Sequence, residues 1–456
     1  MRVAETGSLL NDHDQDRGPK KMKKLMLGSV LSAGLKVASA GLTFLMFMLL
    51  ARVLGAEEYG LFASMFALGT IGAITALFGQ HTLSIKTLSA LGDGPERAAD
   101  RRFALRRSFQ ITLVGAVLVI GAILGAGMAA PVLGFDVNPV YLIGACALVI
   151  PFALAELVSH QYRGFGSILW ALAPRDVLWR AIVLLACLGA ASLPFVFRDA
   201  FTAMIGISLV LMALVVVQLI AMLIRYRDQF AAQPGAQVTA TMPWGVSAWM
   251  WVASLGTMGA SLNLSAAALF LPPDQIGAYF AAQKTSQLLQ LPIIAINIAA
   301  TPVFARLHSQ NDISGLCDVG RKLAMLIAGP LAIGAAILIF FAPDLLSLFD
   351  PSFAAAALAL SILAGSYLLI GLGGPTRPLM LMSNGERPVV RMTLISEAVG
   401  LMLIPILVPA FGIVGAALAA LVVRVLFTLQ TVAWCRTKLG VDTSILSLLP
   451  GGRQTG

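Results

Sequence analysis

The chain has 456 residues, of which 58% are hydrophobic and 12% are charged, and its formal net charge is +9. Its mean hydropathy is +0.88. A soluble core cannot bury this much apolar surface, so the composition excludes a soluble globular protein and predicts a polytopic membrane protein.

Apolar segments long enough to span a bilayer recur along the chain. A spanning helix needs about 20 predominantly apolar residues. About twelve such spans are predicted in an all-α fold, near 25–52, 59–85, 109–130, 139–163, 175–195, 199–224, 243–270, 276–304, 322–342, 353–382, 390–410 and 412–434. Turn sequences such as "FDVNP" at 135–139 and "LPPDQ" at 271–275 separate them.

The basic residues predict the orientation of these spans, because Lys and Arg in short loops stay on the cytoplasmic side. With the N-terminus inside, most of the 31 basic residues fall in cytoplasmic segments, whereas the opposite loops carry acids such as Glu57 and Asp350. Both termini are therefore expected in the cytoplasm. Topology and attraction to anionic membrane lipids explain the positive charge, so nucleic acid is not an expected partner.

The two halves of the chain resemble each other. "LGAEEYGLF" at 54–62 matches "LPPDQIGAY" at 271–279, which aligns Gly60 with Gly277, and "FD" at 135–136 recurs at 349–350. Such a repeat is typical of transporters and predicts two six-helix lobes around a central cavity. The predicted regions are a disordered cytoplasmic tail at 1–24, an N-terminal lobe at 25–224, a cytoplasmic linker at 225–242, a C-terminal lobe at 243–434 and a cytoplasmic tail at 435–456.

Polar side chains within the spans indicate where the cavity lies, because a charge in hydrocarbon costs at least about 2.5 kcal/mol and should face protein or water. The expected cavity-lining residues are Lys36, Thr43, Arg180, Gln283, Lys284, Gln287, Gln290, Asn297 and Arg377. In the alternative interpretation, hydroxyls and amides bond to neighbouring helices and lysines snorkel or pair internally. Arg180 also follows Asp176 at the spacing of an intrahelical ion pair.

Two acids within the spans are candidates for coupling transport to H⁺ or Na⁺. Glu156 shares a helical face with His160 and Arg163, which suits either a proton relay or a structural network. Glu397 has no obvious local partner. The four cysteines are scattered, and neither a P-loop nor an HExxH motif occurs, so we expect no disulfide, metal or cofactor.

The segment "LLARVLGAEEYGLF" at 49–62, which joins the first two spans, resembles the amino-terminal signature of bacterial polysaccharide repeat-unit flippases. Their superfamily also contains multidrug and toxin extrusion transporters and lipid II flippases. The resemblance implies a non-enzymatic, alternating-access carrier of polyprenyl-pyrophosphate-linked oligosaccharide across the bacterial inner membrane. It implies a polysaccharide polymerase and export proteins as partners. Helical spacing, rather than a family motif, makes Lys36 and Lys284 the expected phosphate contacts and the amides the expected sugar contacts.

Two other functions fit parts of the pattern. A cation-coupled multidrug exporter of the same fold usually needs acids in its cavity, whereas the deep charges here are mainly basic. A membrane-bound glycosyltransferase or polymerase would be expected to carry paired carboxylates or a large soluble loop, and the predicted external loops are short.

Overall fold

The computed structural model describes residues 19–92, 94–134, 138–189, 197–230, 238 and 240–444. This described part of the chain is helical throughout and contains no strand. Ten of its helices are long and apolar enough to cross a membrane, which confirms the predicted all-α membrane class. The first copy of the "FD" repeat at 135–136, most of the expected tails and part of the expected linker lie outside the described residues.

The N-terminal half runs from the first helix to a short helix before the expected linker. Its elements are α1 (Pro19–Leu54), α2 (Ala56–Ala76), α3 (Gln80–Leu91), η1 (Pro95–Arg97), α4 (Ala98–Ala129), η2 (Ala130–Leu133), α5 (Pro139–Gly164), α6 (Ile168–Leu172), η3 (Ala173–Leu178), α7 (Trp179–Gly189), α8 (Ala200–Arg225) and α9 (Arg227–Phe230).

The C-terminal half has the same helical character. Its elements are α10 (Trp244–Leu255), η4 (Gly256–Met258), α11 (Gly259–Ala267), α12 (Pro273–Ser286), η5 (Gln287–Leu289), α13 (Gln290–Ser309), α14 (Ile313–Phe340), α15 (Ala342–Ser347), η6 (Pro351–Ala356), α16 (Ala357–Gly373), α17 (Thr376–Met382), α18 (Glu386–Phe411), α19 (Ile413–Trp434) and η7 (Cys435–Leu439).

Two of the twelve expected spans are absent from these ten helices of the described chain. The segment predicted at 175–195 begins inside η3, a π-helical stretch between α6 and α7 that contains Pro174, which has no backbone N–H to donate. The segment predicted at 243–270 is interrupted by the 3₁₀ turn η4. Irregular backbone is tolerated at membrane depth only where protein buries it or where it lines a cavity. The two breaks therefore mark the interior of the molecule rather than its lipid face.

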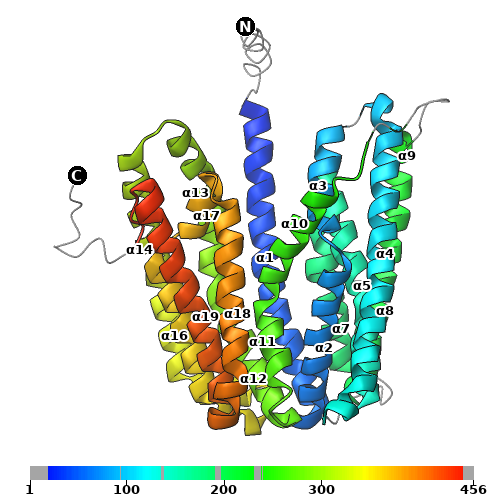
Figure 1. Cartoon of the computed structure of the whole chain (residues 1–456), viewed down its shortest axis with the longest axis vertical. Coiled ribbons are helices and arrows are strands. Elements are labelled where there is room, and N and C mark those ends of the chain that lie inside the picture. Colours follow the sequence, from blue (N-terminus) through cyan, green and yellow to red (C-terminus); the bar gives the residue numbers. More distant parts are fainter. Residues whose placement is uncertain are drawn as a thin grey trace.

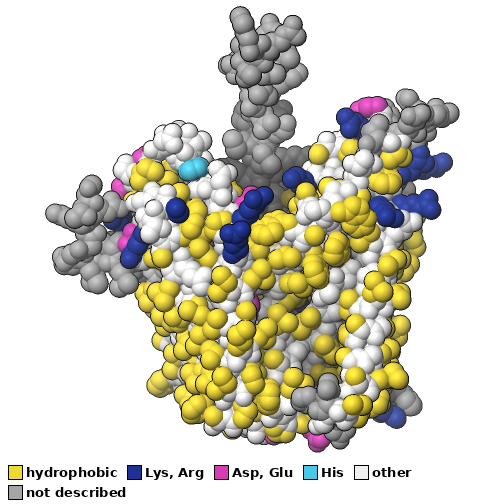
Figure 2. Space-filling view, in the orientation of Figure 1, with side chains coloured by type: hydrophobic (Ala, Val, Ile, Leu, Met, Phe, Trp, Pro, Cys, Tyr) yellow, Lys and Arg dark blue, Asp and Glu magenta, His cyan; other side chains and the backbone are white. Residues whose placement is uncertain are grey.

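The helices form two lobes that meet at one end and diverge toward the other (Figure 1). One lobe contains α2 to α8, the other contains α12 to α19, and α1, α10 and α11 lie between them. Figure 2 shows the surface hollowed between the lobes and an apolar belt around them. Lys and Arg side chains gather at the diverging end, which we call the basic end, and we call the hollow the central cleft.

A backbone contact between α2 and α12 closes the opposite end. A Cβ atom added to Gly60 would lie 1.6 Å from the carbonyl oxygen of Pro273, and one added to Gly277 would lie 2.9 Å from that of Ala56. Each glycine thus meets the first residue of the other helix. The two glycines aligned in the sequence repeat therefore occupy equivalent places in one crossing.

Aromatic side chains fill the space behind this crossing. The rings of Phe47 and Phe280 lie 5.0 Å apart, and those of Tyr59 and Phe353 lie 5.9 Å apart, each pair joining the two halves of the chain. All four residues are buried. Aromatic pairs contribute about 0.5–1.5 kcal/mol beyond their area burial. The crossing and the aromatic cluster together hold the lobes in contact at the closed end.

Replacement of Gly60 by alanine should separate the lobes at the closed end, because the new methyl group overlaps the Pro273 carbonyl. The measurement is the distance between spin labels on cysteines introduced at Val132 and Phe340, which are exposed there, after the native cysteines are replaced by serine. The distance distribution should shift to longer values. Gly121→Ala, where an added Cβ meets no atom within 4 Å, is the control, and an unchanged distribution for Gly60→Ala would contradict the assignment.

Candidate functional site

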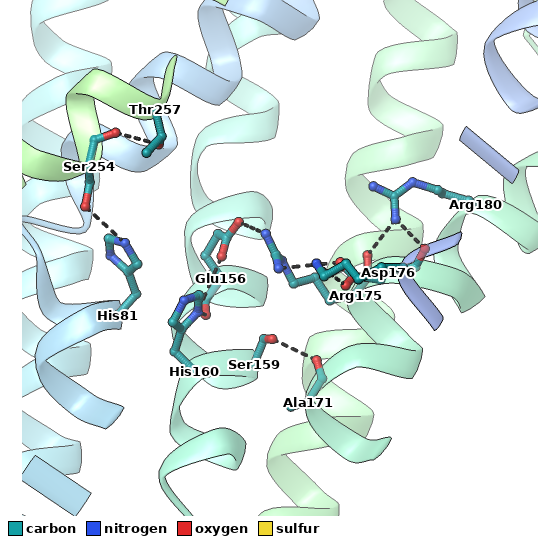
Figure 3. Close-up of polar contacts among 11 residues, drawn as sticks. His81, Glu156, Ser159, His160, Ala171, Arg175, Asp176, Arg180, Ser254 and Thr257 are labelled. Carbon is teal, nitrogen blue, oxygen red and sulfur yellow. Dashed lines mark hydrogen bonds and ion pairs between the residues drawn. The ribbon is translucent and has the colours of Figure 1, made fainter. Parts of the chain in front are cut away.

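A cluster of charged side chains lies inside the N-terminal lobe, where α1, α5 and η3 meet. The Lys36 Nζ donates to Asp176 Oδ2 at 2.8 Å, and Arg175 Nη1 lies 3.4 Å from Asp176 Oδ1. Arg175 Nη2 donates to Glu156 Oε1, and His160 Nδ1 lies 3.5 Å from Glu156 Oε2. Figure 3 shows Glu156 and Arg175 pointing toward each other, with Asp176 beyond Arg175. The two acids are thereby neutralised within the lobe.

Lys36 is the most accessible member of this cluster. Its side chain is 38% exposed, whereas that of Asp176 is 5% exposed. Removing one partner of a buried ion pair costs about 3–5 kcal/mol, because it leaves the other charge uncompensated. The pair therefore fixes α1 to η3 while leaving the ammonium open to a second anion.

Arg180 does not form the ion pair that its spacing from Asp176 suggests. Its Nη1 donates instead to the backbone carbonyls of Arg175, at 3.3 Å, and Asp176, and its guanidinium lies 4.8 Å from the Trp179 ring centroid. The physical reason is that the π-helical turn leaves carbonyls without their usual donors, while Lys36 and Arg175 already bind the carboxylate.

Glu156 and His160, two of the three residues of the predicted proton relay, contact each other in the structure. Arg163 makes no side-chain hydrogen bond or ion pair with the described residues. Arg175, which sequence analysis missed, takes its place from η3. The His81 and His160 rings meet edge to face with centroids 5.0 Å apart, and His81 Nε2 lies 3.2 Å from Ser254 Oγ of α10. These contacts fit the structural-network interpretation of Glu156.

Lys284 lies where the two lobes meet. Its Nζ is 4.8 Å from the ring centroid of Phe280, 5.1 Å from that of Phe47 and 5.9 Å from that of Phe66, so rings from α1, α2 and α12 surround it. Within the described part of the chain, the ammonium has neither an acidic partner nor a hydrogen bond. Cation–π contacts are worth about 0.5–2 kcal/mol each, much less than an ion pair in the same place. The contact between the two lobes therefore retains a positive charge.

Three other predicted residues border a separate cavity of about 290 Å³ inside the C-terminal lobe, namely Gln290, Asn297 and Arg377. Gln290 Nε2 donates to the Tyr367 hydroxyl at 2.5 Å. The Oδ1 atom of Asn297 is buried without a hydrogen-bond partner in the described residues. This cavity thus offers a free acceptor beside the exposed Arg377 guanidinium.

A half-buried arginine packs against Tyr367, which lines this cavity. Arg424 Nη1 donates to Ser366 Oγ and to the Leu363 carbonyl, the latter at 3.2 Å. Its guanidinium carbon lies 3.7 Å from the Tyr367 ring centroid. Arg424 therefore orients the tyrosine that accepts from Gln290.

The remaining predicted residues are divided between the two interpretations. Gln283 is buried and donates to the Ala260 carbonyl at 3.0 Å, and Thr43 Oγ1 donates to the Ser39 carbonyl at 2.6 Å. Gln283 of α12 thus bonds to α11, as the helix-contact alternative expects, whereas Thr43 bonds within its own helix. Gln287 is half-buried and makes no side-chain hydrogen bond to the described residues.

Glu397 of α18 packs against the backbone of Gly259 at the start of α11. A Cβ at Gly259 would lie 2.0 Å from Glu397 Oε1. Among the described residues, the carboxylate has no hydrogen bond and no ion pair. It is the one predicted coupling acid without a neutralising partner in this part of the chain, and it adjoins the broken helix α10–η4–α11.

The sequence-predicted residues thus occupy separate places rather than one continuous wall. The N-terminal lobe holds Lys36, Glu156 and Arg180, the lobe interface holds Lys284, and the C-terminal lobe holds the cavity with Gln290, Asn297 and Arg377. Cations outnumber acids among them, and one of the two acids, Glu156, is already paired. Such an arrangement can bind anions, and no catalytic pair of carboxylates occurs in it.

A known protein family and several solved structures are similar to this chain. The MatE family model matches residues 250–406. No curated protein matches the chain.

Solved structures match over most of the chain. An inward-facing multidrug resistance MATE family transporter of the MOP superfamily matches with a TM-score of 0.70 and 15% identity, over 88% of this chain and 94% of that one. An outward-facing structure of such a transporter matches with a TM-score of 0.58 and 15% identity, over 91% and 95%. A MOP superfamily transporter from Pyrococcus furiosus, described as having a binding pocket of reverse polarity that suggests a different function, matches at 0.57 and 14%, over 91% and 95%. The chain therefore has the two-lobed MATE fold.

Proposed function

We propose that this chain is an alternating-access exporter of amphiphilic molecules and that its cargo carries negative charge. The fold, the greater similarity to the inward-facing structure and the divergence of the two lobes (Figure 1) support the transport step. The observation that carries the charge assignment is Lys284, a cation between the lobes with no acidic partner in the described residues.

The proposed orientation places the basic end in the cytoplasm. Lys and Arg side chains gather at that end and the apolar belt lies below it, as the positive-inside rule requires (Figure 2). In a bacterium the membrane would be the inner membrane. The central cleft would then be open to the cytoplasm, and export would require the lobes to part at the α2–α12 crossing.

Lys36 and Lys284 are the proposed contacts for an acidic group of the cargo. A phosphate could bind Lys36 in competition with Asp176 and could replace the weaker cation–π contacts of Lys284 with charge-assisted hydrogen bonds. Gln287 and Asn297 keep side-chain groups free for sugar hydroxyls within the described residues, whereas Gln283 and Gln290 already donate to the protein.

Two cargo classes are compatible with the fold. The comparisons favour a multidrug exporter, because two of the three transporters cited above are described as multidrug resistance transporters and none is described as a polysaccharide carrier. The charge of the interior instead favours a polyprenyl-pyrophosphate-linked oligosaccharide, with a polymerase and export proteins as partners. The reverse polarity described for the Pyrococcus furiosus transporter supports using pocket charge to separate the two.

The double variant Lys36→Gln/Lys284→Gln tests the anionic cargo. Hydrogen bonds to charged groups contribute about 1.5–3 kcal/mol, so loss of each contact should weaken binding by about tenfold or more. Tryptophan fluorescence of the purified protein can follow titration with a polyprenyl-pyrophosphate disaccharide and, separately, with ethidium.

The control for this experiment is Lys36→Arg/Lys284→Arg, which keeps both charges and should retain the anionic ligand. Equal affinity of the wild type and the glutamine variant for the anionic ligand, together with tight ethidium binding, would refute the anionic assignment and favour a cationic drug as cargo.

A second variant tests ion coupling. Glu397→Gln should abolish the response of transport to an imposed H⁺ or Na⁺ gradient in proteoliposomes, because the amide does not titrate and lacks the negative charge that attracts Na⁺. Glu386→Gln, an exposed acid at the start of the same helix, should leave the response intact. A gradient response that persists in Glu397→Gln would exclude Glu397 as the coupling residue.

A further inference from the structure

Three connected cavities follow the outer face of α4 from the basic end toward the membrane interior. Their volumes are about 590, 380 and 420 Å³. Phe103 and Arg106 line both the first and the second, and Arg107 and Gln110 line both the second and the third. We call this continuous depression the α4 groove.

The upper part of the α4 groove is cationic. Arg102 and Arg106 are exposed, Arg107 is half-buried, and none of the three forms an ion pair with the described residues. Arg101 differs, because it is fully buried and donates to the Gly92 carbonyl at 2.7 Å. Arg107 Nη1 donates to Gln110 Oε1 at 3.4 Å. The first turns of α4 thus direct one arginine inward to hold the fold and place three guanidinium groups without an ionic partner among the described residues around the groove.

The lower part of the groove is apolar and faces the bilayer. Val114 and Leu118 of α4 are 60% and 68% exposed, and Trp244 and Trp251 of α10 form the opposite wall with Phe78. Arg107 lies at the boundary, with its guanidinium carbon 5.7 Å from the Trp244 ring centroid. Tryptophan and arginine at this depth are typical of the level of lipid headgroups.

We propose that the α4 groove binds an anionic phospholipid of the cytoplasmic leaflet. Its phosphate would contact Arg102, Arg106 and Arg107, and one acyl chain would lie along Val114, Leu118 and Trp251. Basic pockets on the cytoplasmic side of membrane proteins take anionic headgroups in this way. A free phosphate would use only the upper part of the groove, so the continuous apolar part favours a lipid.

A lipid bound in the α4 groove would also contact α10. This helix begins the C-terminal half, yet it docks on the N-terminal lobe: Ser247 Oγ donates to the Phe78 carbonyl at 2.6 Å and Trp251 Nε1 donates to the Thr75 carbonyl at 3.1 Å. Because α4 and α10 form opposite walls of the groove, a lipid between them would hold α10 against the N-terminal lobe. This inference does not depend on which cargo is exported.

The test is native mass spectrometry of the full-length protein titrated with phosphatidylglycerol or with phosphatidylcholine of the same acyl chains. The wild type should bind phosphatidylglycerol more tightly. The variant Arg102→Gln/Arg106→Gln/Arg107→Gln should lose about a hundredfold in affinity for that lipid, at about fivefold per arginine, and keep its affinity for phosphatidylcholine. The matched control is Arg306→Gln/Arg387→Gln/Arg391→Gln, which removes as many exposed charges from the other lobe and should keep both affinities.

Equal loss in the control variant, or no loss in the α4 variant, would overturn the proposal. Glycerol phosphate that binds the wild type as tightly as the lipid would show a phosphate site instead. Amide hydrogen exchange of residues 244–251 in wild-type protein gives a measurement that does not depend on the variants. Phosphatidylglycerol should slow this exchange relative to phosphatidylcholine, and equal rates would contradict the bridging role.

Discussion

The structure depends on one close crossing, in which the backbones of α2 and α12 touch because neither helix carries a side chain at the contact. Gly60 meets Pro273 and Gly277 meets Ala56, so the first turns of two equivalent helices interlock. Close backbone packing through glycine is a common means of helix association in membranes, where apolar side chains gain little by leaving lipid. With the lobes joined at this end, their divergence at the other end creates the central cleft.

The charges inside the protein are arranged around that cleft according to how well each is compensated. In the N-terminal lobe, Arg175 forms ion pairs with Glu156 and Asp176, and Lys36 forms a second ion pair with Asp176. Both carboxylates in this cluster are therefore neutralised. At the interface, Lys284 contacts aromatic rings and forms no ion pair or hydrogen bond with the described residues. The uncompensated positive charge therefore lies where the two lobes meet, and this placement supports the proposed anionic cargo.

Hydropathy and the internal repeat were sufficient to predict the membrane class, the two lobes and the equivalence of Gly60 and Gly277. They could not predict that two spans are broken, because hydropathy does not register a π-helical turn or a 3₁₀ turn inside an apolar segment. Helical spacing failed in the same places: it paired Arg180 with Asp176, although the irregular turn directs Arg180 to backbone carbonyls. Arg175 was missed because its partner, Glu156, lies on a different helix, and such a contact depends on tertiary structure.

The aromatic cluster links the crossing to the charge. Phe47, Phe66 and Phe280 surround the Lys284 ammonium, and the same rings pack against one another across the two halves of the chain. When the lobes part at the closed end, Phe280 must move relative to Phe47 and Phe66, and Lys284 must lose some of its cation–π contacts. An anion bound to Lys284 would replace the lost cation–π contacts, whereas the protein without a ligand would lose them without replacement. Ligand binding would therefore favour opening of the end that the glycine crossing keeps shut, which is the thermodynamic requirement for a carrier that exports its cargo.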